Sequence, residues 1–343
     1  MSPVPLSLAT ADGAIRKSAK SKLYQCAFDD LQEVSYAEIP DVKIFILDLA
    51  AAGRSTNAKQ CTIRQFANRI LQAIPHQMEV IYVACDIYSG RSIKEAERKR
   101  RGEGERYILN SPDVKVPNDI SGFLSNGENK EGLFNLIMQT WMEEKYKLGK
   151  KVIYFSSKIN CHLISKEECK VVEELASNHE EADTKVVFLL DHVLQRNGEH
   201  SRVILRSPSG DVDIPIIVYG NQLDTDLRIF LDNGTGKSRK VLDMNSSQLS
   251  SVQKRGIIGF HALTGNDYVS SFFGKGKASC YKIYTKFPHL QAAFCNLGNS
   301  FTVDEQTKVA LREFICKVYG KGRLNDVDEV RRELFWNRLR RDN

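Results

Sequence analysis

Two short apolar segments that each end on an aspartate constrain the fold of this chain most strongly. They are FILD at 45–48 and VACD at 83–86. Such runs are typical of strands buried in a parallel sheet, where the aspartate emerges at the carboxyl edge. A helical pattern at 62–73 lies between them. The two segments are therefore predicted to be neighbouring parallel strands joined by a crossover helix.

The rest of the chain continues this alternation up to about residue 245. Further strands are predicted at 151–157, 202–207 and 213–219, helices at about 131–148, 166–176 and 180–195, and an edge hairpin over 228–244. Strands that alternate with helices indicate a three-layer α/β core around a central, mostly parallel sheet.

The chain of 343 residues is long enough for one large or two ordinary domains. A polar flexible arm is predicted at 1–25 and an α/β core at 26–245, with an irregular insertion at about 89–149. A helical C-terminal region is predicted at 246–343. No internal repeat is visible in the sequence.

Charge and cysteine content narrow the class of protein. The net charge of +6 in a chain that is 27% charged is only mildly basic, so the partner must be inferred from local charge. The eight cysteines include no CxxC pair, and Cys85 and Cys161 fall in strand-like segments. This usage favours reduced thiols and an intracellular protein.

The sequence gives no indication of a membrane protein. It contains no run of eighteen apolar residues, and its N-terminus lacks the apolar core of a signal peptide. We therefore expect neither membrane insertion nor secretion.

Acidic residues recur where strands or turns would deliver them to one cleft. They are Asp48, Asp86, Glu181, Asp183, Asp211, Asp213 and Asp267. Buried like charges repel, so such a cluster is explained best if cations hold it together. Two Mg²⁺ or Mn²⁺ ions fit an all-carboxylate site. The predicted core ligands are Asp86, Asp183, Asp211, Asp213 and Asp267, while Asp48 and Glu181 would act directly or through water.

Each acidic motif also has a purely structural explanation. An aspartate that follows a strand often caps the next helix, which would account for Asp48 and Asp86 one at a time. Asn178 and Glu181 have the spacing of a capping box. Asp211 and Asp213, if they lie on a strand, project to the same face, and this pattern favours metal binding.

Basic residues near these acids suggest contacts to phosphate. In the basic run at 94–106, the residues predicted to contact phosphate are Lys94, Arg98 and Arg101. That run is also compatible with a solvated helix face or a nuclear-import signal. The loop Gly274, Lys275, Gly276 and Lys277 would let backbone N–H groups approach a phosphate of duplex DNA.

Other chemistries lack the residues that they need. GTGKS at 234–238 is no phosphate-binding loop, because Leu231 stands where the first glycine is required. Cys161 and His162 have no second pair at zinc spacing, and no serine or cysteine lies in a nucleophile elbow.

The order and spacing of the acidic segments resembles the flap endonuclease and xeroderma-pigmentosum-G-type 5′ nucleases of the PIN-like superfamily. The resemblance spans about residues 41–280. The family's pattern appears here as Asp48, Asp86, Glu181 with Asp183, Asp211 with Asp213, and Gly265-Asn266-Asp267-Tyr268 with Gly274 and Gly276. The segments SNHEEADT (177–184) and GFHALTGNDYVSSFFGKGK (259–277) also look like a group of uncharacterised, transposon-related animal proteins.

The resemblance implies a PIN-like core with a helix-hairpin-helix-like element near its C-terminal side. It also implies a nuclear enzyme that hydrolyses phosphodiester bonds of DNA in a structure-selective way, with RNA left open as a substrate. Three features depart from the family pattern: the longer polar N-terminus, the insertion after Asp86, and Asp183 where glutamate is commoner. The alternative is a catalytically inactive nuclease-like protein that binds nucleic acid or serves in assembly.

Overall fold

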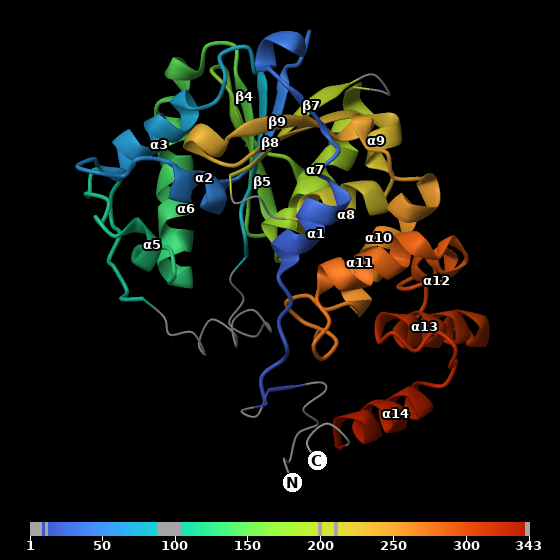
Figure 1. The fold of residues 1–343 in the computed structure, drawn as a ribbon. Coiled ribbons are helices and arrows are strands. Elements are labelled where there is room, and N and C mark those ends of the chain that lie inside the picture. Colours follow the sequence, from blue (N-terminus) through green and yellow to red (C-terminus); the bar gives the residue numbers. More distant parts are fainter. Residues whose placement is uncertain (1–8, 11–12, 88–103, 198–200, 209–211, 340–343) are drawn as a thin grey trace. The chain divides into compact units, whose positions relative to one another are not determined.

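The computed structural model describes residues 9–10, 13–87, 104–197, 201–208 and 212–339 (Figure 1). It divides into two compact units, which are described one at a time. The sheet unit comprises Leu31–Ile214 and Leu223–Ser246. The helical unit comprises Met1–Asp30, Pro215–Gln222 and Ser247–Asn343. The last division falls between Ser246 and Ser247, and the helical unit also takes in the N-terminal residues up to Asp30.

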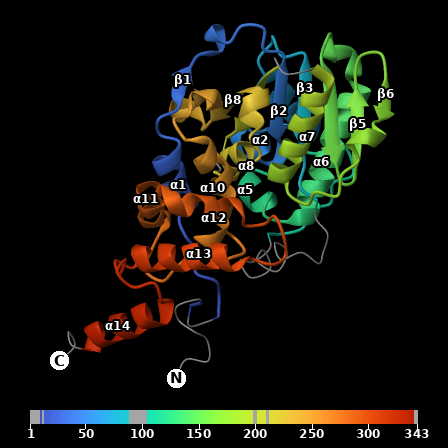
Figure 2. The same ribbon diagram turned by 90° about the vertical axis from the view of Figure 1, so that its right-hand side faces the viewer.

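A single mixed sheet of nine strands, counted over the described residues, forms the centre of the sheet unit. The strands in chain order are β1 (Gln32–Val34), β2 (Ile44–Asp48), β3 (Val80–Ala84), β4 (Val152–Ser157), β5 (Asn160–Ile164), β6 (Cys169–Val171), β7 (Arg202–Ser207), β8 (Arg228–Asn233) and β9 (Lys240–Asp243). Their spatial order is β1-β9-β8-β7-β2-β3-β4-β5-β6. The central run β8-β7-β2-β3-β4 is parallel, and the pairings outside it are antiparallel. Figure 2 shows β1 and β6 at opposite edges.

Helices cover both faces of this sheet (Figure 1). On one face lie α2 (Leu49–Ser55), α3 (Ile63–Gln72), α5 (Ile120–Phe123) and α6 (Gly127–Glu143), and on the other lies α7 (Ala182–Asn197). The remaining short helices of this unit are α9 (Leu223–Asp226) and the 3₁₀ turns at Tyr36–Glu38, Lys145–Leu148, Glu173–Leu175, Gly236–Ser238 and Met244–Ser246. The unit is therefore an α/β fold of the kind expected from the sequence.

Alternation along the strands explains the two layers of core. Phe45 and Leu47 of β2 pack with Phe66 and Ile70 of α3 in one apolar cluster. On the α7 face, the Tyr82 hydroxyl of β3 hydrogen-bonds His192 Nδ1 at 3.1 Å. Because successive side chains of a strand point to opposite faces, a strand buried on both sides must be apolar throughout.

The direction of the connections changes between β2 and β7. The crossover from β2 to β3 runs through α2 and α3 on one face, and β7 is reached through α7 on the other. Open α/β sheets bind ligands at the carboxyl ends of the strands where this change occurs. The fold therefore points to the ends of β2, β3 and β7 as the place for a site.

Three predicted elements differ from the structure. Residues 213–219 are not a strand: they form most of α8 (Asp213–Gly220), whose third residue is Pro215. A short apolar, β-branched run fits a buried helix as well as a strand, and proline is tolerated in a first helical turn. The predicted helix 166–176 is wrong because Cys169–Val171 pairs with β5 as a hairpin strand. The β8–β9 hairpin is confirmed, but β1 pairs with β9, so this hairpin is not at the edge.

A buried carboxylate, Asp232, ties β8 to its neighbours. It is fully buried and bonded by Arg239 Nη2 at 2.7 Å, by Arg206 Nη1 at 3.3 Å and by the Tyr36 hydroxyl at 2.7 Å. This arrangement accounts for an aspartate inside the sheet.

We expect Asp232→Asn to lower the free energy of unfolding by about 3 kcal/mol, because two guanidinium groups would lose their shared counter-charge. Urea denaturation measures this loss. Asp226→Asn, at an exposed position of the same unit, is the control and should change stability by less than about 0.5 kcal/mol. Equal effects of the two substitutions would contradict the structural role of Asp232.

The helical unit has its own aromatic core. Its helices are α1 (Lys20–Ala27), most of α8, α10 (Ser251–Leu263), α11 (Lys277–Lys286), the 3₁₀ turn Pro288–Leu290, α12 (Gln291–Cys295), α13 (Glu305–Val318) and α14 (Val327–Leu339). Phe260 lies 4.9 Å from Tyr284, and Phe294 lies 4.9 Å from Phe314, between ring centroids. None of the helices in the described residues has the length and apolarity that a bilayer crossing requires.

Candidate metal centre at the carboxyl end of the sheet

Four polar residues lie at the carboxyl ends of the parallel strands on the α7 face and are called the polar row below: Asp48 of β2, Ser156 of β4, Ser207 of β7 and Asn233 of β8. The sheet register pairs Asp48 with Ala84, Ala84 with Ser156, and Ser207 with Asn233. The pairing of Leu47 with Arg206 places Ser207 beside Asp48. Two residues earlier on the same face, Ile46 of β2 and Leu205 of β7 are buried and apolar, so on these two strands the change to polar side chains occurs at the strand ends.

Asp48 ends β2 and caps the helix that follows it. Its Oδ1 accepts hydrogen bonds from Ala50 N at 2.7 Å and Ala51 N at 3.3 Å. Its Oδ2 accepts no hydrogen bond from any described residue. Burial and the negative charge of Asp86 raise the pKa of the Asp48 carboxyl to about 6. Helix capping thus accounts for Oδ1 of Asp48, but it does not explain why a second carboxylate, that of Asp86, lies nearby.

Asp86 is held at the N-terminus of α7. Its Oδ1 accepts a hydrogen bond from Ala182 N at 2.9 Å. The backbone on either side is fixed, since Ile87 N donates to Glu180 O at 2.8 Å and Cys85 N donates to Ser156 O at 3.1 Å. These hydrogen bonds join residues 85–87 to residues far along the chain, and they hold Asp86 near Asp48.

Lys185 supports this arrangement from inside the fold. Its side chain is fully buried, and Nζ donates to Cys85 O and Lys158 O, both at 3.0 Å. Burial lowers the pKa of this ammonium group, and the nearby Asp86 charge opposes that change. Lys185 is therefore a positioning residue for the end of β3.

We expect Lys185→Met to destabilise the fold by about 2 kcal/mol, because two buried carbonyl groups lose their donor. Chemical denaturation measures this loss. The exposed Lys170→Met in the same unit is the control and should be nearly neutral. A neutral Lys185→Met would show that the ammonium group does not fix the end of β3.

Glu181 and Asp183 lie at the start of α7, on either side of the bond to Asp86. Helix α7 begins at Ala182, so Glu181 precedes it and Asp183 falls in its first turn. Glu181 is thus not the third helical residue that the predicted capping box requires. Both side chains are partly buried. Negative charge at a helix N-terminus is favoured by the helix dipole, and this holds for Asp86 as well.

The two aspartates after β7 are in part outside the described residues. Asp211 lies there, while Asp213 is a partly buried residue in the first turn of α8. The reasoning that both project from one strand face no longer applies, because Asp213 begins a helix. Their role as ligands stays a prediction.

Asp267 belongs to the helical unit, in the loop between α10 and α11. It is exposed and pairs with Lys20 Nζ at 2.7 Å. The preceding Gly265 has φ of +100°, and a Cβ there would lie 2.6 Å from Ser271 Cα, so glycine is required. That Asp267 joins the acidic cluster of the sheet unit stays a prediction.

The N-terminal segment expected to form a flexible arm contacts this same loop. Arg16 N donates to Ser270 Oγ at 3.2 Å, and Ser271 N donates to Arg16 O at 2.8 Å. Ser18 Oγ donates to Gly265 O at 3.0 Å. Hydrogen bonds from Arg16 and Ser18 thus fix the loop that runs from Gly265 to Ser271 and contains Asp267.

The residues predicted to contact nucleic acid have different environments. Lys94, Arg98 and Arg101 lie outside the described residues. Gly274 and Gly276 are exposed, and Lys275 is half-buried. Lys277 is only 1% exposed, and its Nζ donates to His261 O and Thr264 Oγ1. Its ammonium group therefore fastens α11 to the end of α10.

Sequence reasoning missed two serines of the polar row. Ser156 Oγ and Ser207 Oγ are buried and have no hydrogen-bond partner among the described residues. Buried hydroxyls usually find a partner, so these two groups are available to a ligand. The signal was present, because Ser156 follows the apolar residues of KVIYFSS and Ser207 lies at the end of the strand-like segment RVILRS, much as Asp48 follows the apolar residues of FILD.

The described residues bring together Asp48 and Asp86, with Glu181 and Asp183 at the adjoining helix end. No group of three or more His, Cys, Asp or Glu in this described part has the geometry of a metal site. Comparison of the chain with models of known protein families finds no match, and comparison with curated proteins finds none either.

Proposed function

We propose that the protein is a divalent-metal-dependent nuclease that hydrolyses phosphodiester bonds of DNA by a two-metal mechanism. The observation that carries this proposal is that Asp48 and Asp86 lie together at the carboxyl ends of β2 and β3. Next to them, between β2 and β7, the connections between strands change from one face of the sheet to the other. Each aspartate follows its own strand, and the charge of one raises the pKa of the other. Two neighbouring carboxylates are costly in a metal-free protein and favourable around a cation.

The residues of the site fit a hard cation such as Mg²⁺ or Mn²⁺. The acidic side chains offer the carboxylate oxygens that such a cation prefers, and Asp48 Oδ2 accepts no hydrogen bond from any described residue. Asp86, Asp183, Asp211, Asp213 and Asp267 are the proposed ligands, with Asp48 and Glu181 acting directly or through water. Two bound cations would supply an activated water and stabilisation of the leaving 3′-oxygen.

The chain's own residues would orient the substrate. The carboxylates would fix the place of the scissile phosphate, and the buried Ser207, on the strand next to Asp48, would offer a hydroxyl donor. The residues proposed to contact phosphate are Lys94, Arg98 and Arg101. The loop Gly274-Lys275-Gly276 is proposed to approach the backbone of duplex DNA as part of a helix-hairpin-helix-like element. The resemblance to flap endonucleases supports a nuclear, structure-selective enzyme, with RNA left open.

Cleavage of labelled single-stranded, duplex, 5′-flap and hairpin DNA, with an RNA strand alongside, tests the proposal. We expect products with Mg²⁺ or Mn²⁺ and none with EDTA, and the preferred substrate defines the selectivity. Retained salt-sensitive DNA binding without cleavage under any condition would contradict the enzyme and favour the nuclease-like binding protein.

A further inference from the structure

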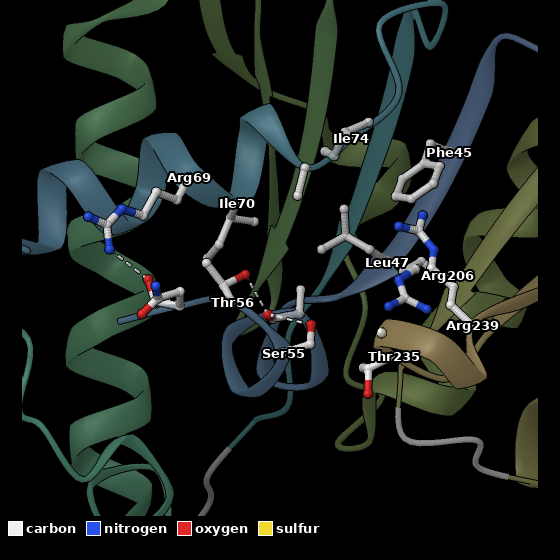
Figure 3. Close-up of a pocket in the computed structure, with 14 residues that line it drawn as sticks. Phe45, Leu47, Ser55, Thr56, Arg69, Ile70, Ile74, Arg206, Thr235 and Arg239 are labelled. Carbon is white, nitrogen blue, oxygen red and sulfur yellow. Dashed lines mark hydrogen bonds between the residues drawn. The ribbon is translucent and has the colours of Figure 1, made fainter. Parts of the chain in front are cut away.

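A pocket of about 370 Å³ opens on the other face of the sheet unit, away from the polar row (Figure 3). Its floor is apolar and includes Phe45 and Leu47 of β2 with Ile70 and Ile74 at the end of α3. Its polar side contains Ser55, Thr56, Arg69, Arg206, Thr235 and Arg239. The volume lies in the range of pockets that hold small organic molecules.

Positive charge dominates this pocket. Three arginines line it, and no acidic side chain is among its described lining residues. The buried Asp232 behind the pocket neutralises one charge, while Arg206 and Arg239 both bond to it. Two guanidinium groups sharing one carboxylate leave an excess of positive charge on the pocket side.

The guanidinium groups of Arg206 and Arg239 also have N–H donors that make no hydrogen bond to a described residue. Arg206 bonds through Nη1 alone, and Arg239 bonds through Nε and Nη2. Arg206 Nε and Nη2 and Arg239 Nη1 therefore donate to no described residue. Figure 3 shows both groups beside Leu47, on the side of the pocket where Thr235 lies. Arg69 also bonds through Nη1 alone, to the carbonyl oxygens of Asn57 and Lys59.

We infer that this pocket binds a small organic anion, with an apolar body on the floor and a phosphate or carboxylate group against Arg206 and Arg239. Guanidinium groups fixed by a buried carboxylate are pre-organised for such an anion, which lowers the entropy cost of binding. The site is independent of the proposed nuclease centre. Residues 45 and 47 point to the opposite face of β2 from Asp48.

Calorimetric titration in EDTA tests this inference with adenosine 5′-monophosphate, naphthalene-2-carboxylate, inorganic phosphate and adenosine. We expect one or both of the first two to bind at least ~10-fold more tightly than phosphate or adenosine, because only they combine both features. Tighter binding of the nucleotide would assign phosphate as the preferred group, and tighter binding of the naphthoate would assign carboxylate.

A pocket-filling variant locates the binding. Ala52 lines the pocket on α2, so Ala52→Leu should weaken binding at least ~10-fold without touching the Asp232 cluster. Ala310→Leu, also at a half-buried helical position, and Asp48→Asn, on the opposite face of β2, are controls that should bind as the unsubstituted protein does. Equal binding of anionic and neutral probes, absence of binding, or an unaffected Ala52→Leu variant would overturn the inference.

Discussion

Replacing both Asp48 and Asp86 with asparagine is expected to reduce divalent-cation-dependent cleavage by ~10³-fold or more. Asparagine keeps the size of each side chain and the caps at Ala50, Ala51 and Ala182, but removes the negative charge that would hold the cations. Loss of several kcal/mol of stabilisation of the transition state corresponds to this factor. Single-turnover cleavage of the preferred DNA substrate is the measurement.

Asp119→Asn provides a matched control for this experiment. Asp119 is also an N-cap, because its Oδ1 accepts from Gly122 N at 2.9 Å, but it is exposed at the start of α5. The control should cleave as the unsubstituted enzyme does. If the double variant still cleaves while Asp119→Asn behaves normally, these two carboxylates do not form the catalytic centre.

Asp48→Asn alone is expected to stabilise the metal-free protein by about 1–2 kcal/mol at neutral pH. The pKa of Asp48 is about 6 in the folded chain and near 4 in an unfolded one. The folded state therefore holds the proton to higher pH, so its stability falls as pH rises from about 4 to about 6 and stays lower above that range. Asparagine removes this loss.

Urea denaturation in EDTA at pH 4, 5, 6 and 7.5 measures this effect. The difference between Asp48→Asn and the unsubstituted protein should be small at pH 4 and largest above pH 6. Asp119→Asn should show no such growth with pH. An Asp48→Asn variant that is less stable at pH 7.5 would mean that capping outweighs repulsion from Asp86.

The α/β class and the central parallel strands could be predicted because their signals are local. FILD and KVIYFSS each contain an unbroken apolar run before a polar end, and β2, β3, β4 and β7 fall where these patterns place them. The errors arose where tertiary context decides. IPIIVY is apolar and β-branched in either state, and its neighbours in the fold make it part of α8. The exposed segment 169–171 becomes a strand only by pairing with β5.

The candidate site was predictable to the extent that strand ends meet at one edge. Asp48 and Asp86 follow from this rule, and it would also have found Ser156 and Ser207. Lys185 was not predictable, because its role depends on carbonyl groups that the fold brings to it from distant segments. The hydrogen bond between Ala182 N and Asp86 also joins residues 96 positions apart, and no local pattern contains it.

Calorimetric titration of the protein with Mn²⁺ tests the central claim most directly, with Asp48→Asn and Asp119→Asn alongside. The account predicts saturable binding by the unsubstituted protein and by Asp119→Asn, and binding weakened at least ~10-fold by Asp48→Asn. Absence of Mn²⁺ binding, or identical binding by all three proteins, would contradict a metal centre at Asp48 and Asp86.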